Sequence, residues 1–513
     1  MDEGEKLMSV TSGAVQVKQS PPETSQSSTL HRLVTWKSAF VVSLGGSLLV
    51  AGSLGTIAGD LGPASVFVWS AVAIMGVLIC LMIAEMASMY PHKAGGTATY
   101  TYEAFKDFAP IVGAISNWGY WLGWIPVVAV NLILAAGYLK SFIPRLTTNE
   151  ELLLAIAMGA GLYVLNYFGL KPGVWSSVAM ALFALAPMVV IVVSPVFRPA
   201  LFHAVNVFPF VPLGGSWHSM TSWKLIFKDM FLAVWSAYAF EAASTVIAEM
   251  KDPHKEAGKA MIAASAAGVF AFCLVPFVVL GICGATLLSG DPSVAFLPAA
   301  QAIFGKIGGV VVSIMLIAAL LLGAQTAIIG STRTIYEMSR DGLILKQMAK
   351  VNKFNVPVGS MIWDGAVTIA LLAKFGTNVP NIVAASNVGY MLVFMLVIPA
   401  FIMLRYQKPG MERPFKLPNV FIPIAAVLTV VNWFLFFVGG AQWGPSVMTP
   451  GVVIMLTFIP FYLYRRYVQD RGHPAPIAAP LGHSAEHPEI PESEIEFSGR
   501  HEVFHDTTDV AAE

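Results

Sequence analysis

An acidic residue lies in the middle of a long apolar segment. The stretch "FLAVWSAYAFEAASTVIAEM", residues 231–250, is long enough to cross a bilayer and holds Glu241 near its centre. Within ten residues on either side, the only Lys or Arg is Lys251. Ionisable groups inside spanning helices usually face the protein interior and mark ion or substrate pathways. Glu241 is therefore a candidate for proton coupling or for a gate. The alternative is a permanently protonated acid bonded to a neighbouring backbone carbonyl.

The composition predicts an all-α polytopic membrane protein. Of the 513 residues, 56% are hydrophobic and only 12% are charged, against roughly 25% charged in soluble proteins. The formal net charge is +0, which gives no support for a nucleic-acid partner. The three cysteines lie in apolar runs without zinc-ligand spacing, and no HExxH, GxSxG or Walker motif occurs. We therefore expect no enzyme, no catalytic residue, no metal site and no cofactor; the partners expected are lipid and a small-molecule substrate.

Twelve stretches are long and apolar enough to be spanning helices. An even number places both termini on the same side of the membrane. Of the 30 Lys and Arg, 23 then fall in cytoplasmic segments if the N-terminus is inside, and this bias predicts cytoplasmic termini in a cell membrane. The predicted spans are 36–60, 64–89, 110–143, 152–169, 174–197, 223–249, 258–287, 308–338, 360–376, 379–404, 421–440 and 446–465.

The first span has a weak point at Gly45, Gly46 and Ser47. Its sequence "VVSLGGSLLVAGSLGTIAG" is rich in glycine, which costs about 1 kcal/mol relative to alanine inside a helix. Unwound backbone is tolerated at membrane depth where protein or a water-filled cavity satisfies it. The alternative is close helix packing through small residues.

The span with Glu241 follows five helices after this weak point. That spacing predicts two five-helix repeats, 36–197 and 223–404, and an additional helix pair at 421–466. Because five is odd, the second repeat inserts upside down relative to the first, as in transporters built from inverted repeats. The flanking segments, 1–35 and 467–513, are polar and are predicted to be disordered cytoplasmic tails; a pH-sensing role for the histidines of the second tail stays open.

Several short motifs occur in a consistent order. "AEM" (84–86) leads into "YPHKAGGTATYTY" (90–102), "WSAYAFEAAS" (235–244) precedes "AEMKDPHK" (248–255), and "STRTIYEMSRDGLI" (331–344) ends the eighth span. Together they resemble the amino acid–polyamine–organocation transporter superfamily, most closely its amino acid permease and antiporter members. The resemblance covers about 36–466 and implies a five-plus-five inverted-repeat (LeuT-like) fold with discontinuous helices 1 and 6.

The resemblance also implies where a substrate binds. Members hold the α-carboxylate and the amine of the substrate on unwound backbone of helices 1 and 6, where free N–H and C=O groups suit these charges. On this sequence the carboxylate side is Gly45, Gly46 and Ser47. The amine side is Trp235, Ser236 and Ala237, with Tyr238 and Phe240 as walls or gates and Glu241 as the coupling or gating residue.

This chain departs from the family pattern at three places. Ala239 and Phe240 stand where a glycine usually precedes the acid, Ala327 stands where the arginine antiporters have tryptophan, and span 174–197 has no central lysine. Coupling through such a lysine is thereby excluded. The coupling ion, proton or sodium, stays open, as do the oligomeric state and the choice among uniport, antiport and symport.

The remaining acids near helix ends have simpler interpretations. Glu85 is expected to pair with Lys93, Glu249 to sit at a solvated helix end, and Asp341 to cap or pair locally. Interhelical hydrogen bonds are expected for the mid-span residues Asn131, Gln325, Thr326 and Asn387.

Two other functions remain compatible with the sequence. A membrane amino acid sensor would bind without translocating, and a polyamine or organic-cation exchanger would use the same fold.

Overall fold

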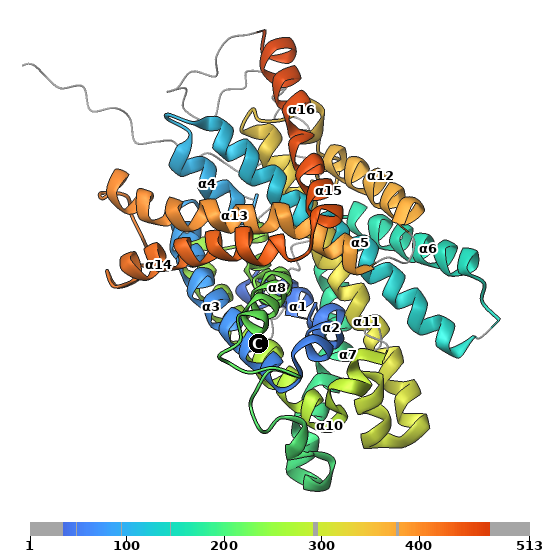
Figure 1. Cartoon of the computed structure of the whole chain (residues 1–513). Coiled ribbons are helices and arrows are strands. Elements are labelled where there is room, and N and C mark those ends of the chain that lie inside the picture. The colour runs from blue at the N-terminus through green and yellow to red at the C-terminus, as the bar shows by residue number, and fades with distance from the viewer. Residues whose placement is uncertain are drawn as a thin grey trace, which may run out of the picture. The chain divides into compact units, whose positions relative to one another are not determined.

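The computed structural model describes residues 34–47, 49–93, 95–143, 145–290, 296–375 and 379–471, and within these ranges the chain is helical without a β-strand (Figure 1). The remaining predicted tail residues, 1–33 and 472–513, lie outside them. The α-helices are α1 Trp36–Ser47, α2 Val50–Leu61, α3 Ser65–Met89, α4 Thr97–Phe105, α5 Pro110–Phe142, α6 Thr148–Tyr167, α7 Leu170–Phe197, α8 Met220–Ala237, α9 Pro253–Val269, α10 Val275–Gly290, α11 Leu297–Arg340, α12 Val358–Phe375, α13 Val379–Gln407, α14 Phe421–Phe434, α15 Pro445–Leu456 and α16 Phe458–Tyr464.

Shorter helical segments join or extend these helices. The 3₁₀ segments are η1 Gly62–Ala64, η2 Pro199–Leu201, η3 Ala204–Asn206, η4 Ala239–Glu249 and η7 Lys346–Ala349, and the π segments are η5 Phe270–Leu274, η8 Leu435–Gly439 and η9 Arg465–Gln469.

Helical residues occupy all twelve predicted stretches, but fewer helices meet a strict test for spanning. In the described part of the chain, eight helices are long and apolar enough to cross a membrane, or nine if the bent pair Leu185–Phe197 and Pro199–Asn206 is one span. By this test, no separate spanning helix is found in three of the predicted stretches, 36–60, 152–169 and 360–376. In the first of these, α1 and α2 have only 12 residues each. The number twelve stays a prediction.

The first span is interrupted slightly later than predicted. Gly45, Gly46 and Ser47 form the last turn of α1, and α2 begins at Val50. A Cβ atom added to Gly46 would lie 2.5 Å from the carbonyl oxygen of Ala239. Both interpretations of this glycine-rich stretch therefore have support, since the helix is interrupted after Ser47 and Gly46 also allows close packing of two backbones.

The sixth span changes its helix type at Tyr238 rather than unwinding before it. Trp235, Ser236 and Ala237 are the last residues of α8, and the following 11 residues form the 3₁₀ helix η4. Such long 3₁₀ runs are uncommon, and a mid-helix stretch often marks a functional hinge. Because Ala239 and Phe240 lack glycine's conformational freedom, the chain keeps helical dihedral angles and tightens its hydrogen-bond pattern.

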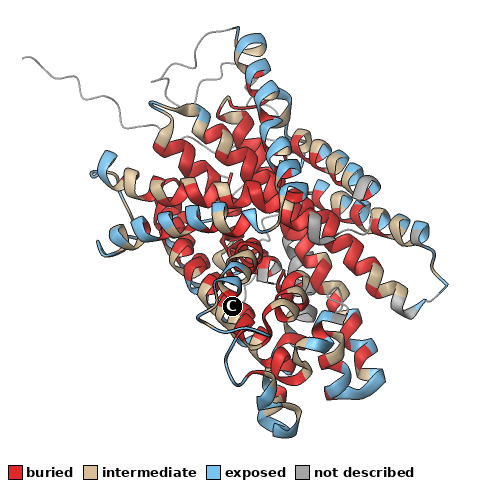
Figure 2. Ribbon diagram, viewed as in Figure 1, coloured by how far each residue is buried: buried red, intermediate tan, exposed pale blue. Residues whose placement is uncertain are grey.

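Equivalent spans of the two predicted repeats pack against each other. α1 contacts η4, α3 contacts α9, α5 contacts α11 and α6 contacts α12. In each pair the second member lies five spans after the first. Buried residues gather along the helices that meet around α5 and α8, whereas exposed residues follow α14 and α16 (Figure 2).

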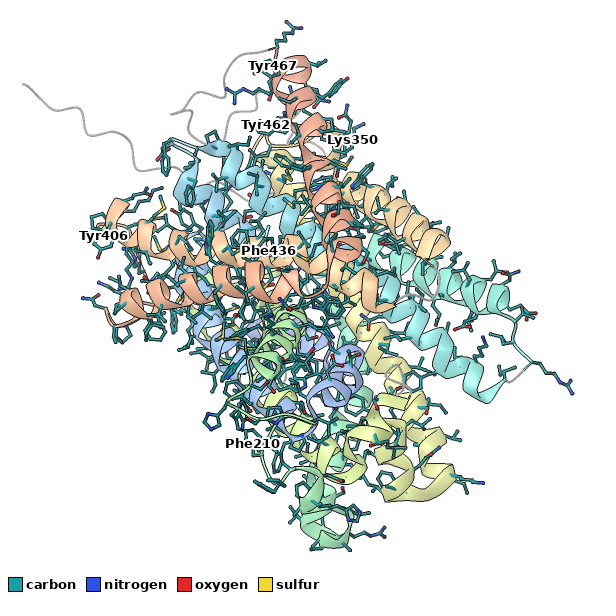
Figure 3. All side chains as sticks on the ribbon, in the orientation of Figure 1. Phe210, Lys350, Tyr406, Phe436, Tyr462 and Tyr467 are labelled. Carbon is teal, nitrogen blue, oxygen red and sulfur yellow. The ribbon has the colours of Figure 1, made fainter. Side chains whose placement is uncertain are left out.

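The exposed side chains of α14 are apolar. Val427 and Val430 are 62% and 68% exposed, and Phe437 in the adjoining η8 is also exposed. This is the surface expected of a helix that faces hydrocarbon. Phe210, in a predicted outer loop, and Lys350, in a predicted cytoplasmic loop, lie at opposite ends of the bundle (Figure 3).

We expect Gly46→Ala to destabilise the protein, because its Cβ would meet the backbone of η4. Overpacking of this kind costs about 1–3 kcal/mol. Gly52→Ala is the matched control: nothing lies within 4 Å of its added Cβ, and removal of a helical glycine stabilises by up to about 1 kcal/mol. Melting temperatures of the purified proteins in detergent measure both effects. Equal melting temperatures for the two variants would contradict close packing at Gly46.

Candidate functional site

The interruptions of the first and sixth spans lie directly against each other. Ser236 Oγ donates to the carbonyl oxygen of Leu49 at 3.2 Å and lies 3.0 Å from Ser53 Oγ. Gly46 faces the carbonyl of Ala239 on the same side. The fold thus places the two interruptions side by side, although these contacts join Ser236 to Leu49 and Ser53, and Gly46 to Ala239, rather than the predicted carboxylate side to the predicted amine side.

The predicted wall residues contact protein on all sides. Trp235 Nε1 donates to the carbonyl oxygen of Gly123 at 3.3 Å, and the Tyr238 hydroxyl donates to Asn432 Oδ1 at 3.3 Å. The ring of Phe240 is buried between α3 and α9. These contacts connect the α8–η4 junction to α3, α5, α9 and α14.

Glu241 lies in the first turn of η4 and is 1% exposed. In the described part of the chain its carboxylate has no Lys or Arg within ion-pair distance. Tyr120 Oη donates to both carboxylate oxygens at 2.8 and 2.9 Å, and Tyr390 Oη donates to Oε1 at 3.1 Å. Ser244 Oγ donates to Oε2 at 3.2 Å, and Thr97 Oγ1 donates to the same oxygen. The alternative of an acid bonded to a backbone carbonyl therefore does not describe this site.

The four hydroxyls come from separate parts of the fold. Thr97 is on α4, Tyr120 on α5, Tyr390 on α13 and Ser244 on η4 itself. Sequence reasoning named none of them as site residues. In the sequence, each of these residues is recognisable only as a hydroxyl-bearing side chain in or beside an apolar stretch. That pattern does not show which group the hydroxyl will bond.

Aromatic packing holds the two tyrosines in place. The rings of Tyr120 and Tyr390 are 6.2 Å apart, and Trp124 contacts both at the same separation. Tyr390 also packs edge-on against Phe394 at 4.9 Å. Because the rings of Tyr120 and Tyr390 are packed in this way, their hydroxyl groups are held in position to donate to Glu241.

A second buried acid, Asp364 on α12, has a different environment. Trp121 Nε1 donates to Oδ1 at 3.1 Å and Tyr163 Oη donates to Oδ2 at 2.8 Å. Tyr163 also lies 2.9 Å from Thr368 Oγ1. The group links α5, α6 and α12, and none of these hydrogen bonds involves the two interrupted spans.

Lys93, in the loop after α3, is the centre of a buried charge cluster. It pairs with Asp341, with Glu337 at 3.1 Å and with Glu103 at 3.5 Å. Burial by itself would lower the pKa of Lys93, but these three carboxylates raise it well above its usual value. Lys93 is therefore an ammonium at physiological pH and connects the loop to α4 and to the end of α11.

Two expectations about acids near helix ends were wrong. Glu85 pairs with Arg405 at 2.8 Å and with Arg413 at 3.4 Å rather than with Lys93. Glu249 is 3% exposed and pairs with Arg333 at 2.8 Å, so it does not sit at a solvated helix end. Asp341 is the C-cap residue of α11, which agrees with the expected cap, but its buried side chain pairs with Lys93, which is distant in sequence. Sequence separation hid these pairs, since the partners are 84 to 320 residues apart.

Three of the four mid-span polar residues form the interhelical hydrogen bonds expected of them. Gln325 exchanges two hydrogen bonds of 3.1 Å with Asn166, Thr326 donates to the carbonyl oxygen of Val42 at 2.7 Å, and Asn387 donates to that of Phe231. Asn131 instead donates to Val127 within its own helix.

The architecture defines a class of protein. A helical chain with several long apolar helices, apolar exposed faces and buried charges at its core is a multi-pass membrane protein. A family model described as amino acid permease matches residues 34–460, and the chain therefore belongs to the amino acid permease family. It is a transport protein and not an enzyme.

Individual relatives are distant in sequence. The branched-chain amino acid permease BcaP of Bacillus subtilis is 24% identical over 80% of this chain and 88% of its own length. The polyamine transporter RMV1 of Arabidopsis thaliana is 28% identical over 69% of this chain and 67% of its own. The polyamine transporter PUT1 of Oryza sativa is 26% identical over 68% of this chain and 64% of its own.

Breaking the Arg333–Glu249 pair is expected to reduce stability strongly. Glu249→Ala leaves a buried guanidinium without its carboxylate, which costs about 3–5 kcal/mol. The matched control is Lys255→Ala, which removes the exposed ion pair with Asp252 and is worth at most about 1 kcal/mol. Thermal unfolding in detergent compares them. Similar melting temperatures for both variants would contradict a stabilising role for the buried pair.

Proposed function

We propose that the chain is a secondary transporter that moves an amino acid or a related amine across the cell membrane by alternating access. The substrate binds between the α1–α2 interruption, at Gly45, Gly46 and Ser47, and the α8–η4 junction, at Trp235, Ser236, Ala237, Tyr238 and Phe240. Glu241 is the coupling or gating residue. Both termini lie in the cytoplasm, and α14 faces lipid.

One observation carries this proposal. Two interrupted spans from different halves of the chain meet, and a buried carboxylate with no cationic partner among the described residues lies one turn beyond their contact. Polar backbone at membrane depth is expensive unless it serves a site. A charged group there is a functional-site hypothesis by default.

The hydroxyl environment suits a group that changes its protonation state. Each of the four hydroxyls can donate to an ionised carboxylate, and each also has lone pairs that accept from a protonated one. A fixed Lys or Arg partner would instead hold the acid permanently ionised. The site therefore keeps Glu241 hydrogen-bonded whether a proton is present or has left.

The packing of equivalent spans supports the inverted repeat. Contacts between α1 and η4, α3 and α9, α5 and α11, and α6 and α12 follow the five-span spacing predicted from the sequence. In such folds the site lies at the interface of the repeats, and one repeat rocks against the other. The Lys93 cluster and the Arg333–Glu249 pair, at the predicted cytoplasmic side, would hold that side closed.

The relatives include both an amino acid permease and polyamine transporters, so both substrate classes are candidates. One observation favours a cationic amine as the second candidate: Glu241 has no cation of its own among the described residues, so an ammonium could neutralise it. The family argues against an amino acid sensor, because the relatives that resemble this chain are named as permeases and transporters.

Uptake by proteoliposomes tests transport itself. Purified protein should accumulate at least one labelled amino acid or polyamine, and a competition series with and without sodium and with a pH gradient should identify substrate and coupling ion. Protein-free liposomes give the background. Saturable binding without accumulation for every compound would reject transport and favour a sensor.

Glu241→Gln tests the role of the carboxylate. The amide preserves size and most hydrogen bonds but cannot exchange a proton, so transport should lose its pH dependence and fall at least tenfold under a pH gradient. Asp364→Asn is the matched control, because this buried acid bonds to Trp121 and Tyr163 rather than to the hydroxyls around Glu241, and its pH profile should resemble that of the unmodified protein. An unchanged profile for Glu241→Gln would end the coupling proposal.

A further inference from the structure

The connection between α7 and α8 has an unusual composition for a loop. From residue 199 to residue 223 the sequence contains no Asp, Glu, Lys or Arg, whereas the shorter connection 408–420 contains four such residues. Charged side chains are the ones that proteins most consistently expose to water. Their absence over the whole length of this connection indicates that water is not its only surroundings.

The exposed side chains of the connection are largely apolar. Val205 is 78% exposed, Leu213 56% and Phe208 55%. Phe210 and Val211 are exposed as well, and Figure 3 shows Phe210 at one end of the bundle. Apolar side chains that are exposed together on one segment mark a contact with a membrane or with another protein.

This apolar surface continues from the end of α7. Val193, Val196 and Phe197 are exposed there, and exposed apolar side chains on a helix of a multi-pass membrane protein contact hydrocarbon. The chain then bends by 110° between Leu185–Phe197 and Pro199–Asn206. After this bend the segment runs across the direction of the helix before it. It therefore follows the membrane surface instead of extending from the helix end into water.

Hydrogen bonds fix the other side of the connection to the bundle. The backbone N–H of His203 and the side-chain Nδ2 of Asn206 donate to the carbonyl oxygen of Gly281 on α10, at 2.9 and 3.0 Å. Further along, the backbone N–H of Leu213 donates to the carbonyl oxygen of Leu61 on α2 at 3.0 Å. The segment is thus attached to α10 and α2, and its exposed apolar side chains are held on the outer surface.

Two tryptophans and two basic residues indicate the depth of the segment. Trp217 Nε1 donates to the carbonyl oxygen of Phe210, and Trp223 Nε1 donates to that of Trp217, both at 2.8 Å. Tryptophan is enriched at the membrane–water interface. Arg198 and Lys224, which border the segment, are exposed, and side chains of this length reach the polar level of a bilayer. Irregular backbone does not occur exposed to lipid in the hydrocarbon region itself, so the depth that fits is the headgroup level.

We propose that residues 199–223 form a membrane-interface segment, with Val205, Phe208 and Leu213 inserted among the phospholipid chains of the leaflet at this end of the bundle. In the orientation proposed above this is the outer leaflet. Continuity with the exposed apolar side of α7 favours lipid over a second copy of the chain as the partner. The inference concerns a surface outside the substrate site and does not depend on the substrate or on the role of Glu241.

Spin labels attached to single cysteines test this placement. The full-length protein, with its three native cysteines replaced by alanine, carries Val205→Cys or Phe208→Cys and is reconstituted into phosphatidylcholine nanodiscs. Power saturation then compares the access of oxygen, which concentrates in the bilayer, with that of a nickel chelate, which stays in water. Both labels should be accessible to oxygen and protected from the chelate. Leu213→Cys provides a further position where one of these variants does not fold.

Two control positions calibrate the result. Val193→Cys, on α7, gives the response of a side chain that faces lipid, and Asn149→Cys, exposed near the start of α6, gives the response of one that faces water at a helix end. Loop labels as accessible to the chelate as the label at Asn149 would overturn the proposal. Protection from both reagents, with spectral broadening that disappears when labelled protein is diluted with unlabelled protein, would also overturn it, because a second copy would then cover the segment.

Discussion

The placement of a buried carboxylate with no Lys or Arg partner in the described part of the chain determines much of this structure. The side chains that bond Glu241 there all do so through hydroxyls, and these come from several elements because one helix cannot surround a carboxylate. α4, α5, α13 and η4 therefore converge on one point. The bonds from Thr97 and Tyr120 to Glu241 join the first half of the membrane domain to the second, so a relative movement of the two halves would break or exchange them.

The junction beside Glu241 shows how a chain can interrupt a helix without glycine. Family members usually have glycine before the acid, whereas here Ala239 and Phe240 continue in helical dihedral angles and the hydrogen bonds tighten into a 3₁₀ helix. The glycine that allows a close approach lies on the neighbouring helix α1, at Gly46. The two interruptions therefore differ in kind: one separates two helices, and the other changes the helix type.

The predicted helices were found because hydrophobic length and composition are local properties. The interruptions after Ser47 and at Tyr238 lay within a few residues of their predicted positions, since glycine content and mid-span polarity mark weak points. The partners of the charged residues were predicted poorly. Glu85 pairs with Arg405 and not with its sequence neighbour Lys93, and Glu249 is buried and pairs with Arg333. The sequence does not predict these ion pairs because the helices that form them meet only after folding.

The sequence by itself determined a helical membrane protein and the presence of an unusual acid at Glu241. Only the tertiary structure decided which groups surround that acid, because the hydroxyls of Thr97, Tyr120 and Tyr390 have no sequence signal that connects them to it. Contact between distant segments is a property of packing rather than of any local pattern.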